Sequence, residues 1–265
     1  MNLHAVNAAL LLAGLATPFA SHALSAPVED VASFLGTTLA QMEAINPMSG
    51  EVDESGREGV MTRGVAMSRV ISVQAGDTLS FDWFFGTEEV FANNGVLDFG
   101  FFSLDGVLTP LANSGDAIES TEDGDDSTFS PFPHHLPQDN GAYFRTHTVT
   151  FDTAGEHHIG FAVVDTVDTV VRTGLVLDRV SINGTLLDNG GFEDSEFDGT
   201  NTHFFNWQAL GDVSPWDNWP PAPEGSVGAA LISGDFEQTP VPLPAGVWLL
   251  GSALGALAWR GRRRG

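Results

Sequence analysis

Apolar and polar residues alternate along much of the chain between residues 60 and 182. The pattern occurs in short segments that are separated by turn-forming residues, which is typical of half-buried antiparallel strands. The expected strands span residues 65–73, 78–85, 97–104, 143–151, 157–164 and 174–182. Turn signals at Gly76-Asp77, Asp105-Gly106 and Asn183-Gly184 agree with this spacing. Short strands joined by turns predict an all-β fold, an antiparallel β-sandwich.

Two segments depart from this alternation. Residues 28–45 carry apolar residues at helical spacing, which predicts one or two short N-terminal helices. Residues 115–140 are polar, contain three prolines and include the acidic run 122–126, so they predict a surface loop.

The C-terminal region has a membrane-like pattern. Residues 243–259 contain no charged side chain, and as a helix they would span roughly 25 Å, enough for a short transmembrane helix. A basic membrane stop follows immediately, formed by Arg260, Arg262, Arg263 and Arg264. The positive-inside rule then places the C-terminus in the cytoplasm and the preceding residues outside. A buried core helix is the alternative, but an all-arginine end is unusual for one.

The N-terminal region resembles a secretory signal peptide. Residues 5–15 form an apolar stretch of the right length, and Ser21-His22-Ala23 offers small residues for cleavage after Ala23 or Ala26. We assign residues 1–26 to the signal peptide and residues 27–238 to an exported domain. A helix retained in the fold is the alternative.

Composition agrees with an exported protein. The chain has no cysteine and no lysine, and all 35 acidic residues lie between Glu29 and Glu237. Only six arginines share that region, so its net charge is −29 with histidine neutral. Such a charge repels nucleic acid and anionic lipid, and it suits divalent cations, high salt or a solvated acidic face.

Residues 239–265 are similar to the PEP-CTERM sorting signals of Gram-negative bacteria. The resemblance rests on the motif, the apolar helix and the arginines, in that order. The motif residues are Val241, Pro242, Leu243, Pro244 and Ala245, with Leu243 where the better-known form has glutamate. The resemblance implies export, temporary anchoring by the C-terminal helix, and processing by an exosortase-type membrane protease. It also implies a cell-surface or extracellular location in a bacterium that makes exopolysaccharide.

Residues 69–83, 98–101 and 160–165 look like the galactose-binding-like jelly rolls often found before such tails. A second fragment, residues 189–193 with 229–234, resembles the opening strands of carbohydrate-binding jelly rolls, although it comes last here. This order suggests a circular permutation, which folds with adjacent termini tolerate. The resemblance also implies a structural calcium ion, with Asp178 and Glu193 as its ligands by position. Their alternative role is an ordinary turn carboxylate and a strand-end ion pair with Arg179 or Arg172.

Catalytic chemistry has little support in the sequence. There is no cysteine and no Gly-x-Ser-x-Gly elbow, and a pair of carboxylates is undiagnostic among 35. His157 and His158 are adjacent on an expected strand, so they point to opposite faces and cannot easily bind one zinc ion. The acidic run 122–126 is a weaker calcium candidate. No cofactor is required by these patterns, and we expect no enzyme.

Three tryptophans lie in the proline-rich region near the end of the exported domain: Trp207, Trp216 and Trp219. Exposed indole faces stack on sugar rings, so these residues are candidate ligand-stacking positions; the alternative is that they fill the end of the core. We therefore expect a non-enzymatic structural or adhesive surface protein. The second hypothesis is a carbohydrate-binding module that recognises exopolysaccharide.

Overall fold

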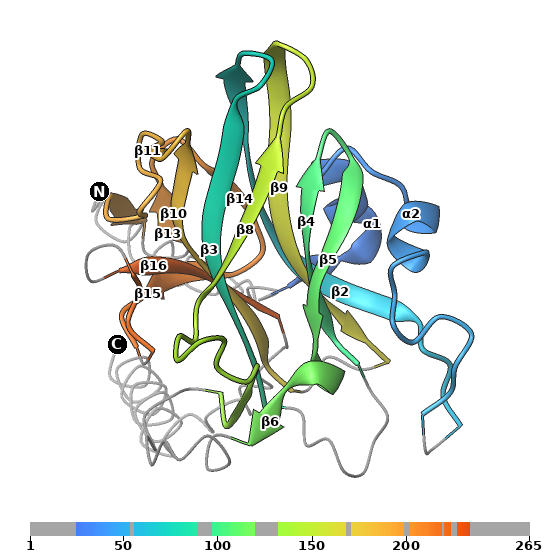
Figure 1. The fold of residues 1–265 in the computed structure, drawn as a ribbon. Helices are drawn as coiled ribbons and strands as arrows, with labels where there is room; N and C mark the ends of the chain where they lie inside the picture. The colour runs from blue at the N-terminus through green and yellow to red at the C-terminus, as the bar shows by residue number, and fades with distance from the viewer. Residues whose placement is uncertain are drawn as a thin grey trace, which may run out of the picture. The chain divides into compact units, whose positions relative to one another are not determined.

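Two antiparallel sheets make up most of the structure (Figure 1). This computed structural model describes residues 25–53, 56–88, 97–119, 132–167, 171–198, 202–218, 220–223 and 227–233. The first sheet has the order β1 (Ala26–Pro27), β2 (Met61–Val73), β9 (Gly155–Thr166), β4 (Phe99–Leu104) and β5 (Val107–Asn113), with β14 (Gln208–Leu210) also paired to β2.

The second sheet has the order β15 (Val213–Trp216), β16 (Gly228–Ser233), β10 (Thr173–Ile182), β3 (Thr78–Thr87), β7 (His134–His135) and β6 (Ile118–Glu119). Two more strands pair within it, β11 (Thr185–Leu186) with β10 and β8 (Arg145–Thr150) with β3. A separate two-stranded ribbon joins β12 (Ser195–Phe197) to β13 (Thr202–Phe204). The predicted all-β, antiparallel architecture is therefore confirmed.

Aromatic rings from both sheets meet in the central core. The Phe81 ring, on β3, lies with its centroid 4.8 Å from Phe161 on β9 and 5.1 Å from Phe102 on β4. All three side chains are almost fully buried. Such tilted and edge-on pairs stabilise a fold by about 0.5–1.5 kcal/mol each beyond the area that they bury. The alternation in β3, β4 and β9 thus packs one sheet on the other.

The outer face of the first sheet is covered by the N-terminal helices, α1 (Val28–Phe34) and α2 (Leu39–Glu43). Leu35, just after α1, is fully buried, and a Cβ atom built on Gly160 would lie 2.4 Å from its Cδ2 atom. Gly160 therefore allows the helix to pack closely on β9. The prediction of one or two short helices within residues 28–45 is confirmed, since α1 and α2 both lie there.

The C-terminal part of the described chain belongs to both sheets. β16 pairs with β10, with Leu231 opposite Leu175, and β14 pairs with β2, with Ala209 opposite Met67. The residues after Asn189 are therefore not a separate module.

Some expected features differ from the structure. Residues 115–140 are not wholly a loop, because a 3-10 helix (η1, Ser114–Asp116) and the strands β6 and β7 fall in or beside the described parts of this segment. The structure also contains β5, which the pattern did not predict. The fold begins by Ser25, which is fully buried, whereas the expected domain starts at Pro27.

The predicted membrane segment, residues 243–259, lies outside the described residues, as does most of the predicted signal peptide. None of the helices within the described ranges has the length and hydropathy needed to cross a bilayer.

Candidate functional site

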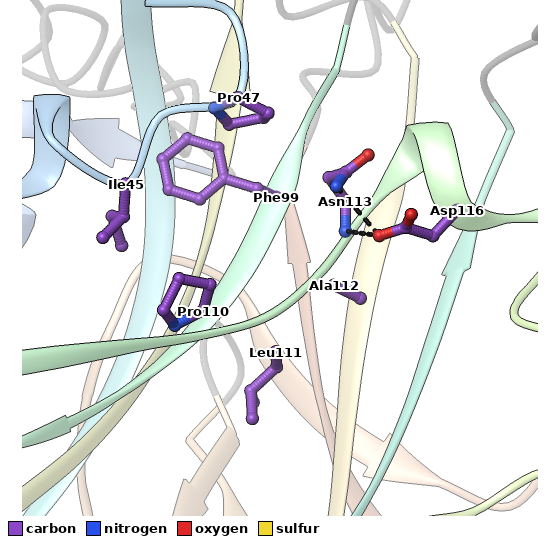
Figure 2. Close-up of a pocket in the computed structure, with 8 residues that line it drawn as sticks. All are labelled: Ile45, Pro47, Phe99, Pro110, Leu111, Ala112, Asn113 and Asp116. Atoms are coloured by element: carbon purple, nitrogen blue, oxygen red, sulfur yellow. Dashed lines mark hydrogen bonds between the residues drawn. The ribbon is translucent and has the colours of Figure 1, made fainter.

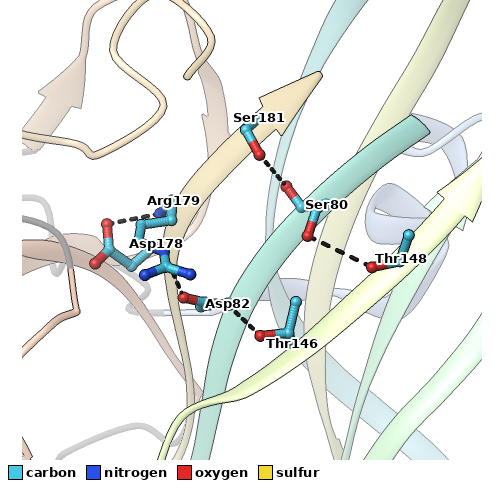
Figure 3. Close-up of polar contacts among 7 residues, drawn as sticks. All are labelled: Ser80, Asp82, Thr146, Thr148, Asp178, Arg179 and Ser181. Atoms are coloured by element: carbon cyan, nitrogen blue, oxygen red, sulfur yellow. Dashed lines mark hydrogen bonds and ion pairs between the residues drawn. The ribbon is translucent and has the colours of Figure 1, made fainter. Parts of the chain in front are cut away.

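Asp178 lies in the middle of β10, directly opposite Asp82 on β3 (Figure 3). Both carboxylates are buried, with residue exposures of 0% and 4%. Like charges opposite each other on a sheet are destabilising, and a buried carboxylate needs hydrogen-bond donors. The donors come from Arg179, whose backbone N–H lies 2.7 Å from Asp178 Oδ1 and whose Nε lies 2.7 Å from Asp82 Oδ2.

A β-bulge places Arg179 in this position. Asp178 pairs with Asp82 and Ser181 pairs with Ser80, so Arg179 and Val180 together face a single residue of β3. Arg179 has a φ of 51°, an unusual value for a residue with a side chain. Its guanidinium points outward while Val180 packs in the core, and Thr146 Oγ1 donates to Asp82 Oδ1 at 2.6 Å.

The two predicted calcium ligands lie in different surroundings. One oxygen of Asp178 already accepts the N–H of Arg179, whereas Glu193 is exposed after the buried Phe192. Within the described ranges there is no group of three or more histidine, aspartate or glutamate side chains that could hold a metal ion. Calcium binding at Asp178 and Glu193 stays a prediction.

Two of the three candidate stacking tryptophans are core residues. Trp207 is 8% exposed, its Nε1–H donates to the carbonyl of Asn189 at 3.0 Å, and the Arg69 guanidinium lies 5.1 Å from its ring centroid. Trp216 is 1% exposed and donates to the carbonyl of Pro220 at 2.8 Å. Neither indole offers a free ring face, which agrees with the alternative that they fill the core. Trp219 lies outside the described residues.

A small pocket opens beside the edge strand β5 (Figure 2). Its apolar lining comes from Ile45, Pro47 and Pro110, with the nearly fully buried Phe99 ring, only 2% exposed, behind them. Leu111 and Ala112 complete the lining from β5.

The other end of this pocket is polar. Asn113 and Asp116 fix each other, because Asp116 Oδ2 accepts from Asn113 Nδ2 at 2.9 Å and Asn113 Oδ1 accepts from the Gly115 N–H at 2.7 Å. The result is a carboxylate held in one orientation next to an apolar lining, in a turn where Asp116 is exposed and Ser114 is buried.

The pocket has a volume of about 100 Å³. Pockets for whole small molecules usually have about 300–1,000 Å³, so this one suits a single group of a larger ligand. Its lining combines proline and aliphatic side chains with one carboxylate, so it offers both apolar contact and a hydrogen-bond acceptor. Sequence reasoning missed the pocket because its residues come from three separate segments and carry no shared motif.

The sorting motif 241–245, the arginines of the membrane stop and the acidic run 122–126 lie outside the described residues. Comparisons with protein-family models, with curated proteins and with solved structures give no match for this chain.

Proposed function

We propose that the chain is an exported bacterial surface or extracellular-matrix protein with a structural or adhesive, non-enzymatic role. The observation that carries this proposal is the order of motif, apolar segment and arginines in residues 241–264. The organisation of the chain is compatible with it: β16, the last strand within the described residues, ends at Ser233, upstream of the motif at residues 241–245. The net charge of −29 upstream of the motif is also compatible with life outside the cell.

Peptide mapping of the mature protein from its native host tests the sorting step. We expect a C-terminus within residues 241–245 and recovery from the cell surface or the medium. The variant Pro242→Ala/Pro244→Ala should keep its tail, because it loses the motif but retains the apolar segment. Thr239→Ala, just before the motif, is the matched control. An intact chain ending at Gly265 in the inner membrane would contradict exosortase-type processing and leave a plain membrane anchor.

The pocket beside β5 favours a second candidate function, a carbohydrate-binding module. Its apolar lining and its fixed carboxylate suit one sugar unit of an exopolysaccharide. A permuted jelly roll is compatible with part of the topology: β16, from the second half of the fragment that resembles the opening strands, lies beside β10, the expected last strand, although residues 189–193 form no strand.

Glycan-array binding tests this second function. Asp116→Asn should abolish any binding that uses the pocket, while Glu156→Gln, an exposed carboxylate change on β9, should not. Binding that persists in Asp116→Asn would exclude the pocket. Trp216→Ala is a poor probe, because the loss of a buried ring costs about 3–5 kcal/mol of folding stability by itself.

A structural calcium ion at Asp178 and Glu193 belongs to the same jelly-roll proposal. If an ion binds the folded state there, removing it with a chelator lowers the melting temperature, and Glu193→Gln removes that response. A melting curve that chelator leaves unchanged would eliminate the ion.

A further inference from the structure

Both ring nitrogens of His157, on β9, face hydrogen-bond acceptors. Nδ1 lies 2.6 Å from Asp105 Oδ2, and Nε2 lies 3.1 Å from the carbonyl oxygen of Thr153. The side chain is 12% exposed, and its ring packs 4.8 Å from the Phe151 ring. A neutral imidazole has one N–H and one lone pair, whereas the imidazolium has two N–H donors. Only the charged form can therefore satisfy both contacts.

Asp105 connects this histidine to the turn between β4 and β5. Its Oδ1 accepts the backbone N–H of His158 at 2.8 Å, and its own N–H donates to the carbonyl of His158 at 2.8 Å. These two hydrogen bonds fix both the side chain and the main chain of Asp105 against β9, with Asp105 at a φ of 50°.

The same turn touches the connection between the two helices. A Cβ atom built on Gly106 would lie 2.3 Å from the carbonyl oxygen of Gly36, and Gln41 Nε2 donates to the Gly106 carbonyl at 3.4 Å. His157, the turn and the helix connection thus form one continuous set of contacts between β9 and the helices that cover the first sheet.

Few of the described groups near His157 are charged, and β2 places the uncharged Ile71 opposite it. Asp105 comes from the β4–β5 turn, His158 and Glu156 are its neighbours on β9, and Asp152 belongs to the turn before β9. The helix connection, residues 35–38, contributes no titratable side chain. The Asp105 carboxylate is therefore the dominant electrostatic partner.

We propose that His157 and Asp105 form a pH-sensitive latch, closed by the imidazolium, which holds the β4–β5 turn and through it the α1–α2 connection against β9. Loss of the ring proton removes one of the two hydrogen bonds and the ion pair, and the turn and the helix connection open more often.

The electrostatics agree with this direction. The hydrogen bond from Asp105 raises the pKa of His157 above its ordinary value of 6.5 and outweighs the burial of the ring. Burial raises the pKa of Asp105, but the N–H of His158 and the ring of His157 together lower it below 3.8. A raised histidine pKa stabilises the fold fully below about pH 6.5, and this stabilisation is lost as pH rises through the folded-state pKa. On the acid side, the contribution of Asp105 is lost only as pH falls below 3.8 through its lowered pKa.

Two measurements on the full-length chain, solubilised in detergent, test the latch. An NMR titration of the imidazole signals should give His157 a pKa above 6.5. Hydrogen exchange, corrected for the intrinsic rate at each pH, should show that Asp105, His158 and residues 36–41 lose protection as His157 deprotonates. A variant, Asp105→Asn, should bring the His157 pKa back toward 6.5 and remove the pH dependence of that protection.

The chain contains a matched control. His203 also pairs with an aspartate, Asp198, at 2.9 Å, but its side chain is 61% exposed and its pair spans only the β12–β13 ribbon. His203→Gln should leave the protection of residues 36–41 unchanged at every pH. A His157 pKa at or below 6.5 would overturn the latch. So would protection of the turn that stays constant while His157 deprotonates. Neither result bears on sorting, so failure of the latch is distinct from failure of the proposed function.

Discussion

Arg179 is, with Val167 and Phe192, one of three described residues with positive φ that are neither glycine, asparagine nor aspartate. Of the described non-glycine residues in that region, most are asparagine or aspartate, whose short polar side chains tolerate it. Arg179 has no such tolerance, and its conformation is held by two neighbours: Asp178 accepts its N–H and Asp82 accepts its Nε. The Arg179 side chain is 45% exposed, so its guanidinium pairs with the buried Asp82 and also reaches solvent.

Two replacements of Arg179 should therefore distinguish the contribution of the ion pair to stability from that of the backbone strain. Arg179→Ala leaves the Asp82 carboxylate buried without its cation and keeps a Cβ at positive φ. We expect a loss of about 2–3 kcal/mol, below the full value for a buried pair because Arg179 is half exposed. Arg179→Gly loses the same pair but relieves the strain, so it should be more stable than Arg179→Ala by about 1 kcal/mol.

Urea denaturation of the two variants measures this difference, with Thr148→Ala on the same outer face as the control. Thr148 makes one long contact of 3.5 Å to Ser80, so its removal should change stability by less than about 0.5 kcal/mol. If Arg179→Gly proves less stable than Arg179→Ala, backbone strain is not a feature of the bulge.

At the scale of elements, two connections depend on single residues. Asn189 holds the base of the β12–β13 ribbon: its Nδ2 donates to the carbonyls of Asp194 and Phe205, and its Oδ1 accepts the Asp194 N–H. The β4–β5 turn depends on Gly106, where the main chain approaches Gly36. In both places a single residue positions a pair of strands: Asn189 positions β12 and β13, and Gly106 positions the turn between β4 and β5.

Asn189→Ala should release the β12–β13 ribbon. Three hydrogen bonds are lost, and although the Asp194 carbonyl keeps the N–H of Phe205, the Asp194 N–H and the Phe205 carbonyl lose the partner that Asn189 provides; we expect a cost of about 1–3 kcal/mol. Hydrogen exchange should show loss of protection confined to residues 194–205. Asn140→Ala is the control, because Asn140 has nearly the same φ (52° against 55°) but a single side-chain bond, to Asp139. Equal effects from both changes would mean that only the φ matters.

Gly106→Ala tests the close approach of the turn to the helix connection. The added methyl would lie 2.3 Å from the Gly36 carbonyl oxygen at a φ of +78°, so strain and a backbone clash act together. Gly50→Ala has nearly the same φ, +77°, with nothing within 4 Å. The control should lose about 1 kcal/mol and Gly106→Ala clearly more, by thermal or urea denaturation. Similar losses would show that the main chain relaxes around the methyl group.

At the scale of the whole molecule, the ends of the described chain are integral to the sheets. Ala26 pairs with Gly64 on β2 at one end, and β16 pairs with both β10 and β15 at the other. The sandwich therefore uses residues that the sequence pattern assigned to the signal peptide.

This pairing predicts the processing position at the N-terminus. Cleavage after Ala26 would remove the buried Ser25 and one of the two pairs of β1, whereas cleavage after Ala23 keeps both. We expect the mature chain to begin at Leu24, as measured by N-terminal peptide mapping of the exported protein. A mature chain that begins at Pro27 would show that β1 is dispensable.

The long strands could be predicted because each carries its own alternation. The predicted segments 65–73, 78–85 and 174–182 fall within β2, β3 and β10. β5 could not be predicted, since Pro110 interrupts it and only pairing with β4 makes it a strand. β6 and β7 have two residues each, too few for a sequence pattern, and they are strands only because β7 pairs with β3 and β6 pairs with β7. Of the candidate site residues, Asp178 was placed correctly on a strand, but its contact with Asp82 depends on the register.

The sequence by itself determined the strand-rich class, the short N-terminal helices and the charge, because period, turn residues and composition are local properties. Only the tertiary structure decided that Trp207 and Trp216 are buried, that Asp178 faces Asp82, and that Phe99 and Asp116 line one pocket. These features join residues far apart in the chain. They depend on strand register and sheet packing, which local patterns do not specify.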